Sequence, residues 1–228
     1  ALVALKGRRV VHDFAIEGEE QPAALLKAEL GSRKIPWRKA RVGISRSLTI
    51  VKTLRLPPAV EGSLARMVAF ELERHVPFPA EEACFDFVRL PGPVNGLSEA
   101  LVVAAERRTV EGVLRLMDDA GLRPVSLTVA AHDLTALVGR WSRAGRAAWL
   151  HRINEEVNLL LLDGPRLRLS RSFPWTDAET LAKEIRKTLT LLRWDALDGL
   201  WVSGDGSDDL VASPALGALG PVTPPPFT

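Results

Sequence analysis

Residues 157–173 read VNLLLLDGPRLRLSRSF, and this stretch decides the fold. Two aliphatic runs, Val157–Leu162 and Leu167–Phe173, flank an Asp-Gly-Pro turn, which is typical of a β-hairpin. Another strand-like run, Ala147–Ile153, precedes the hairpin, and a helical pattern from Asp177 to Trp194 follows it. The C-terminal part of the chain therefore predicts an α/β unit that begins with three strands.

The N-terminal part of the chain repeats this order. Leu2–Leu5 and Arg9–Ile16 flank a Lys-Gly-Arg turn, and an acidic loop and a helical pattern through Leu30 follow. Both halves read strand, turn, strand, acidic loop, helix, strand. A duplicated α/β unit predicts two lobes that face one another across a cleft. The strand that matches residues 147–153 would fall before Ala1, so we expect the sequence to begin inside its fold.

The composition is that of an ordinary globular protein. The 228 residues are 46% hydrophobic and 25% charged, with a formal net charge of +2, which favours a packed core and argues against nucleic acid as a partner. The single cysteine, Cys84, excludes an internal disulfide. No apolar run reaches the roughly 20 residues of a spanning helix. The histidines lack metal-ligand spacing, so we expect neither a metal site nor a cofactor: His12, His75, His132 and His151.

The segment from Leu54 to Leu90 carries a series of motifs. They are LRLPP at 54–58, ELERHVPFP at 71–79 and FDF at 85–87. Further motifs follow in order, namely VVAA at 102–105, AGLRP at 120–124, EIRKTL at 184–189 and VSGDGS at 202–207. Together they resemble the type IV pilus assembly protein PilM and the cytoplasmic domain of the type II secretion protein GspL, collinearly over nearly the whole chain.

The resemblance implies a two-lobed actin-like fold, a duplicated RNase H-like unit. Residues 1–140 would form the first lobe, with an inserted strand and helix subdomain around 41–105. Residues 141–220 would form the second lobe, and 221–228 a Pro-rich tail or linker. The helical subdomain that this family inserts after Phe173 is nearly absent here, so we expect a reduced form of the fold.

The same resemblance implies a function without catalysis. We expect a scaffold or adaptor domain at the cytoplasmic face of the bacterial inner membrane. Its expected partners are a secretion or pilus assembly ATPase and a single-pass inner-membrane subunit of the platform. The chain would reach the membrane through a partner or through a helix beyond the sequence given. The choice between pilus and type II secretion, and formation of a homodimer, stay open.

Nucleotide binding is the alternative, as an actin-like ATPase or a sugar-kinase-like protein. Nucleotide-binding relatives keep a D-I-G loop at the start of the second lobe, where this chain has HRINEE at 151–156. Phosphate binding usually needs glycine to turn N–H groups toward the ligand, and Glu155 and Glu156 stand here instead, so we expect no hydrolysis. A weak residual nucleotide loop remains at Gly204, Gly206 and Ser207. The same residues suit a plain strand-to-helix turn, capped by the serine or the aspartate after it.

Two surface segments are candidate binding sites. A proline-rigid loop and the helix end before it predict a partner-binding surface, formed by Glu71, Arg74, Val76, Pro77, Phe78 and Pro79. A plain solvated helix end is the alternative. A basic segment around one tryptophan predicts contact with anionic lipid through Arg33, Lys34, Trp37, Arg38 and Lys39. The alternative there is a solvated loop with the tryptophan packed inward.

Overall fold

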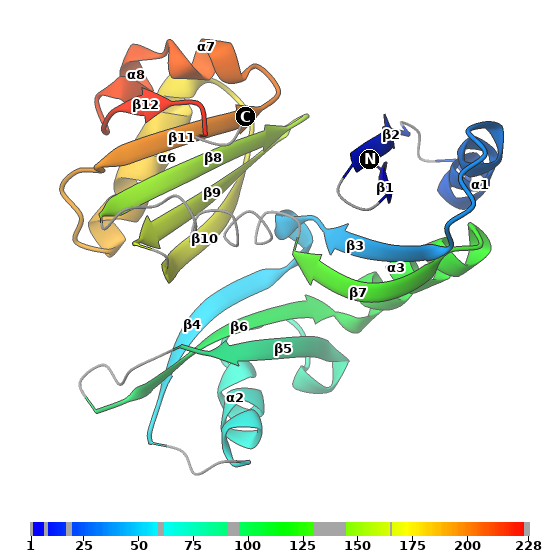
Figure 1. Ribbon diagram of the computed structural model, residues 1–228. Coiled ribbons are helices and arrows are strands. Elements are labelled where there is room, and N and C mark those ends of the chain that lie inside the picture. The colour runs from blue at the N-terminus through cyan, green and yellow to red at the C-terminus, as the bar shows by residue number, and fades with distance from the viewer. Residues whose placement is uncertain are drawn as a thin grey trace.

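The computed structural model describes residues 2–6, 9–16, 20–58, 62–90, 96–129, 145–164 and 166–225. They form two lobes of α/β structure (Figure 1). The first lobe, coloured blue to green, carries an additional three-stranded sheet, and the second, coloured yellow-green to red, is built on one five-stranded sheet. None of the described helices has the length and apolar character needed to cross a bilayer.

The second lobe is a mixed sheet in the order β10-β9-β8-β11-β12. Its strands are β8 (Arg146–Ile153), β9 (Glu156–Asp163), β10 (Arg166–Pro174), β11 (Gly199–Gly204) and β12 (Val222–Thr223). The first three are antiparallel neighbours, whereas β11 lies parallel to β8, and β12 parallel to β11. Three consecutive strands therefore lead into two parallel crossovers made by helices.

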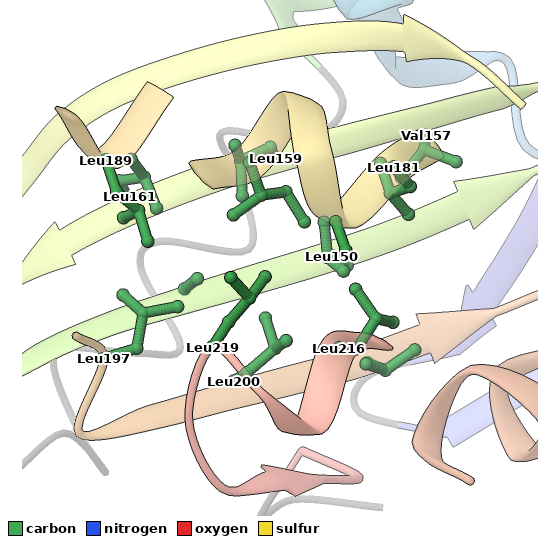
Figure 2. Close-up of a cluster of buried hydrophobic side chains, with 14 of the residues drawn as sticks. Leu150, Val157, Leu159, Leu161, Leu181, Leu189, Leu197, Leu200, Leu216 and Leu219 are labelled. Atoms are coloured by element: carbon green, nitrogen blue, oxygen red, sulfur yellow. The ribbon is translucent and has the colours of Figure 1, made fainter. Parts of the chain in front are cut away.

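Three helices cover one face of this sheet, namely α6 (Ala178–Leu191), α7 (Ser207–Val211) and α8 (Pro214–Gly217). Asp177 is the N-cap of α6, and its carboxylate accepts a hydrogen bond from the N–H of Thr180. Leucines and an isoleucine at i, i+4 and i+8 on α6 pack on the leucines of β8, β9 and β11 (Figure 2). Full burial of one such side chain contributes about 1.5–3 kcal/mol.

The opposite face of the sheet is also buried. Trp149, Leu160 and Leu162 are at most 1% exposed and contact Leu101 of the first lobe. A strand that is covered on both faces needs no polar alternation. This is why four leucines can follow one another in β9.

The first lobe contains two separate pairs of strands. In the first pair β1 (Leu2–Lys6) is antiparallel to β2 (Arg9–Phe14), and in the second β3 (Lys39–Ile44) is parallel to β7 (Arg123–Val129). The helices α1 (Pro22–Ser32) and α3 (Arg107–Asp119) contact one another. The shared core contains Ala4, Leu30, Ile35, Met117, Ala120 and Leu122.

The additional sheet is antiparallel, in the order β4-β6-β5. It consists of β4 (Ile50–Leu56), β5 (Ala83–Arg89) and β6 (Ser98–Glu106), with α2 (Leu64–Leu72) against one face and the 3-10 turns η1 (Arg46–Leu48) and η2 (Ala80–Glu82) at its ends. Val68 and Leu72 of α2 are almost fully buried against the alanines and leucines of β4 and β6.

Several boundaries differ from expectation. The helical pattern expected through Leu30 continues through Gly31, because α1 ends at Ser32. Two residues of the expected Pro-rich tail, Val222 and Thr223, form β12 at the sheet edge. As expected for a reduced form of the fold, by contrast, only three residues, 175–177, separate β10 from α6, where the family inserts a helical subdomain. The predicted lobe boundary between residues 140 and 141 lies outside the described residues.

Candidate functional site: the cleft between the lobes

A cleft of about 640 Å³ lies between the additional sheet and the second lobe. One wall comes from β4 and the other from β10, and each is an edge strand of its sheet among the described residues. Edge strands present N–H and C=O groups that can pair with another chain. A chain that entered the cleft could therefore meet the backbone groups of two strand edges, β4 and β10, and the side chains between them.

Arg46 joins the two lobes at one end of this cleft. Its Nε donates to the Oγ of Ser170 at 2.8 Å and its Nη2 to the carbonyl oxygen of Ser170 at 2.6 Å. Its Nη1 donates to the carbonyl oxygen of Thr49 at 2.6 Å. Burial above all lowers the pKa of Arg46 to about 10, so the side chain remains a cation at neutral pH.

A second contact across the lobes lies one residue earlier. The Oγ of Ser45 is 2.8 and 3.0 Å from the two carboxylate oxygens of Glu156 on β9. Partial burial raises the pKa of Glu156, but hydrogen bonds from hydroxyl groups, first Ser47 and then Ser45, outweigh it and leave the pKa below its usual value. The carboxylate is therefore ionised and committed to the contact between the lobes.

A buried carboxylate lies deeper in the cleft. Glu99 on β6 is 4% exposed, and its two oxygens lie 3.1 Å from the Nε of Arg55 and 3.9 Å from the Nη1 of Arg168. Arg55 belongs to the same sheet, whereas Arg168 belongs to β10 of the second lobe. Burying this charge is tolerated because both lobes supply a partner cation.

The turn after β8 lies where the resemblance places the phosphate loop of nucleotide-binding relatives. Asn154 adopts a left-handed φ of 50°, and its N–H donates to the Oδ2 of Asp205 at 2.7 Å. The carboxylate thus takes a backbone donor of this turn. Arg152 donates from Nε to the carbonyl oxygen of Asn154 at 3.3 Å, and its guanidinium lies 4.0 Å from the ring centroid of Trp175.

The residual loop of the sequence prediction packs against this turn. A side chain at Gly204 (φ 91°) would place Cβ 1.9 Å from the carbonyl oxygen of Arg152, so the two backbones require a glycine there. Gly206 (φ 62°) is the residue before α7, and the helix begins at Ser207. The predicted cap by the serine or the next aspartate is therefore wrong, because the glycine occupies the N-cap position.

Ser203 ties the same loop to β8. Its Oγ accepts from the Nε1 of Trp149 at 2.8 Å and lies 2.9 Å from the Nδ1 of His151. Burial above all lowers the pKa of His151, so the ring is neutral near pH 7. This half-buried histidine therefore has a role in packing rather than as an exposed acid or base.

The predicted partner-binding residues divide into two groups. Val76 and Phe78 are half-buried and pack against the core of the additional sheet, whereas Pro77 and Pro79 are exposed. Glu71 lies 3.5 Å from the Nη1 of Arg74 and 3.7 Å from the Nε2 of a histidine one residue further on. The exposed prolines and the ion pair thus share the surface beyond the end of α2.

The sequence prediction missed Phe70. This side chain is 67% exposed, and the guanidinium of Arg74 lies 5.7 Å from its ring centroid. Phe70 borders a surface hollow of about 520 Å³ that also includes Pro57 and Met67. Helical periodicity could have identified it, because Phe70 lies off the face that carries Val68 and Leu72.

The basic segment follows α1 as an exposed connection to β3. All five predicted lipid-contact residues are exposed, namely Arg33, Lys34, Trp37, Arg38 and Lys39. Trp37 is 40% exposed, so it is not fully packed inward. Arg33 is held by Glu29 at 2.8 Å and lies over the ring of Phe14, whereas Arg38 donates to the carbonyl oxygen of Ile35.

Metal binding finds no support in the part of the chain that the structure describes. No three histidine, cysteine, aspartate or glutamate side chains gather there as a metal ion would need. The described cysteine, Cys84, is half-buried at the start of β5.

Comparison with known proteins shows which family the chain belongs to. Residues 2–144 match the family model described as type IV pilus assembly protein PilM, which is more than half of the chain. The chain belongs to the PilM family. A search of curated proteins finds no match.

Solved structures show that the fold of this PilM-family chain is shared. A chain of a PilM–PilN type IV pilus biogenesis complex is 22% identical, with a TM-score of 0.75 over 90% of this chain and 75% of that one. The cytoplasmic domain of EpsL, an inner-membrane component of the Vibrio cholerae type II secretion system, is 15% identical, with a TM-score of 0.64 over 99% and 79%.

A third similar solved structure is described as having an actin-like ATPase fold. A Bacteroides thetaiotaomicron protein of unknown function with an actin-like ATPase fold is 13% identical, with a TM-score of 0.55 over 86% of this chain and 73% of that one. The matches confirm the expected family of pilus and secretion assembly proteins and the expected actin-like fold.

Proposed function

We propose that this PilM-family chain is a cytoplasmic adaptor domain of a type IV pilus or type II secretion platform at the inner membrane. It would bind other proteins and hydrolyse no nucleotide. The observation that carries the second part is the 2.7 Å hydrogen bond from the N–H of Asn154 to the carboxylate of Asp205. An acidic side chain already occupies a donor that a phosphate would require.

Charge repulsion would oppose the binding of a phosphate beside the Asp205 carboxylate. A phosphate near Asn154 would lie beside Asp205, and two like charges about 4 Å apart repel by about 4 kcal/mol at an effective dielectric constant of about 20. The loop also opposes phosphate binding by its bulk, because Gly204 already contacts the backbone of Arg152. Binding of a nucleotide would therefore require both the carboxylate and the loop to move.

The nucleotide hypothesis is tested by thermal unfolding with ATP and Mg²⁺. A nucleotide at 100 times its Kd would add about 2.7 kcal/mol to the free energy of unfolding, so a binding protein would melt visibly later. We expect no shift for the native chain. Asp205→Asn removes the negative charge beside Asn154, and Asp208→Asn is the matched control. A shift in the melting temperature of the native chain would establish nucleotide binding and overturn the proposal.

The expected partners are a secretion or pilus assembly ATPase and the tail of a single-pass inner-membrane subunit. A PilM–PilN complex among the similar structures supports the second partner for this chain. Exposed Phe70 on α2, and exposed Pro77 and Pro79 in the segment after it, supply apolar contacts of the kind that partner proteins use. Homodimer formation is a further arrangement that this surface would allow.

Pull-down with the purified chain tests these partners. We expect it to retain the cytoplasmic domain of the ATPase or a synthetic tail of the membrane subunit, and Phe70→Ala to weaken retention at least about tenfold if this aromatic is a central contact. Leu191→Ala is the control, because Leu191 is equally exposed, at 72%, but lies on α6. Retention of neither partner would contradict the adaptor role.

A second candidate role is direct contact with the membrane surface. The exposure of Trp37 together with four basic side chains favours it, because each basic residue near anionic lipid contributes about 1 kcal/mol. Flotation with vesicles containing anionic lipid should be weakened by salt and by Lys34→Glu with Lys39→Glu. Lys183→Glu, at an exposed position of α6, should leave flotation unchanged. An equal loss of flotation in all variants would rule out a local membrane site.

A further inference from the structure

The cleft between β4 and β10 carries an excess of positive charge. Five residues of each strand line it, Val51–Arg55 and Leu167–Arg171, and the two strands face one another (Figure 1). The lining has two carboxylates against five cations, which are Arg46, Lys52, Arg55, Arg168 and Arg171. The whole chain, by comparison, has a formal net charge of only +2. The positive charge is therefore concentrated in the cleft.

Most of these cations lack a carboxylate partner. In the part of the chain that the structure describes, Arg55 and Arg168 share the single carboxylate of Glu99, and the other three cations of the lining have no carboxylate within 4 Å. The second carboxylate of the lining, Glu71, lies beside Arg74 and the histidine after it. The two acidic residues therefore do not balance the charge of the cleft.

Glu99 fixes two guanidinium groups on opposite walls without neutralising both. A guanidinium has five N–H donors in a planar fork, and Glu99 faces one nitrogen each of Arg55 on β4 and Arg168 on β10. The side chains of Arg55 and Arg168 are 58% and 30% exposed, so their remaining donors can be reached from solvent. Both can therefore bind a second carboxylate that enters the cleft.

A second group of cations lies at the other end of the cleft, where Arg46 meets Ser170. Burial is the main cause of the lowered pKa of Arg46, and Arg171 lowers it further because two nearby cations repel one another. Arg168 and Arg171 are three residues apart on β10, which is about 10 Å in an extended strand. A small anion would contact only one of these groups, whereas an extended chain would contact both.

We propose that the cleft binds an acidic, extended segment of a partner protein, about five residues long. Its acidic side chains contact Arg55 and Arg168 at one end and Arg171 at the other. Its backbone pairs with the open edge of β4, because the carbonyl oxygen of Ser170 on β10 already accepts a hydrogen bond from Arg46. This inference rests on the proposed adaptor function only in taking the occupant to be a protein.

The test uses the 228-residue chain and a fluorescent heptapeptide with blocked ends, in which glutamate alternates with valine. In the control peptide glutamine replaces every glutamate. Fluorescence anisotropy measures the Kd of each peptide. We expect the acidic peptide to bind at least about tenfold more tightly than the control. Its Kd should rise at least about tenfold from 0.1 to 1 M NaCl, because the screening length falls from about 10 Å to about 3 Å.

Substitutions in the chain locate the site. Lys52→Gln combined with Arg171→Gln breaks no ion pair of the described residues and should raise the Kd of the acidic peptide about tenfold. Arg115→Gln should leave the Kd unchanged, because Arg115 is 70% exposed and lies on α3, outside the lining of the cleft. Arg168→Gln should also weaken binding, and thermal unfolding checks its fold, since it leaves buried Glu99 with one partner.

Three outcomes would overturn the proposal. Equal binding of the two peptides would mean that the cleft does not select acidic side chains. Equal effects of Arg115→Gln and of the double variant would place binding elsewhere on the surface. Displacement of the peptide by inorganic phosphate or ATP at micromolar concentration would assign the cleft to small anions.

The same measurements separate this site from the proposed adaptor surface. Phe70→Ala should leave the Kd of the acidic peptide unchanged, because Phe70 does not line the cleft. A chain that retained platform proteins in the pull-down but bound no acidic peptide would lose the cleft site and keep the adaptor role. A chain that bound the peptide through the cleft but retained neither platform protein would keep the site and lose that role.

Discussion

At Gly204 two backbones approach so closely that the residue admits no side chain. The Cβ of an alanine would lie 1.9 Å from the carbonyl oxygen of Arg152, and the φ of 91° is strained for any L-residue with a side chain. We expect Gly204→Ala to lower the free energy of unfolding by more than about 2 kcal/mol. Chemical denaturation measures the change.

Gly31→Ala is the matched control for this substitution. Gly31 lies inside α1 and a Cβ there meets no atom within 4 Å. Alanine should therefore stabilise the chain by about 0.5–1 kcal/mol, because it reduces the freedom of the unfolded chain. If both substitutions changed stability alike, the close approach at the β11 loop would be wrong.

The carboxylate of Glu156 makes stability depend on pH. Its pKa in the folded state lies below the unfolded value of 4.5 because hydrogen bonds from Ser47 and Ser45 outweigh burial. The stabilisation is therefore complete above pH 4.5 and is lost as the pH falls through the folded pKa. Glu156→Gln should destabilise the chain at pH 7, and the difference from the native chain should shrink in acid.

Denaturant unfolding at pH 7 and at several values below 4.5 checks this dependence on pH. Glu155→Gln is the control, since its exposed side chain neighbours the same turn. A difference between the native chain and Glu156→Gln that stayed constant across these pH values would contradict the ionised contact with Ser45.

At the scale of elements, α2 carries one residue that we expect to matter for stability, Leu72, and another that we expect to matter for binding, Phe70. Leu72 is 2% exposed and packs in the core of the additional sheet, whereas Phe70, two residues earlier, is 67% exposed. Leu72→Ala should cost about 2–5 kcal/mol, because it removes packing and leaves a cavity. Phe70→Ala should stay within about 0.5 kcal/mol, since surface substitutions rarely do more. Thermal unfolding of both variants would refute this arrangement if their order were reversed.

The elements that could be predicted from sequence are those with strong periodicity. The strands β8, β9 and β10 and the helix α6 have long aliphatic patterns and clear turns, and their structural bounds lie within a few residues of the expectation. The strand β12 could not be predicted, because its two residues, Val222 and Thr223, form a strand only through pairing with β11. Tertiary contact overrides local composition there.

The site could be predicted only in part, for a related reason. Glycine at 204 and 206 signals a tight loop, and the sequence predicts that loop correctly as a turn. Nothing local indicates that Arg46 reaches Ser170, because the two residues lie 124 positions apart. Buried cations of this kind become visible only once the lobes are placed together.

At the scale of the molecule, Arg46 holds the lobes together. Arg46→Ala would leave the carbonyl oxygens of Thr49 and Ser170 without this donor. Hydrogen bonds to a charged group contribute about 1.5–3 kcal/mol, so we expect a loss of about 2–3 kcal/mol. Hydrogen exchange in η1 and β10 should also quicken before global unfolding.

Arg108→Ala is the control for this change. Arg108 lies 2.7 Å from Glu106 but its side chain is 82% exposed, so its loss should cost less than about 1 kcal/mol. Equal losses for the two arginines would mean that the contact between the lobes contributes no more than a surface ion pair.

The Arg46 guanidinium also affects how the lobes can move. Two of its three hydrogen bonds cross to Ser170 and the third holds it to Thr49 of its own lobe, so rotation of one lobe strains both bonds to Ser170 together. Opening is consequently a latch-like event with two settings rather than a gradual widening. A protein that entered the cleft would have to break both bonds to Ser170 before the lobes could part, and until then the two lobes would move as one rigid body.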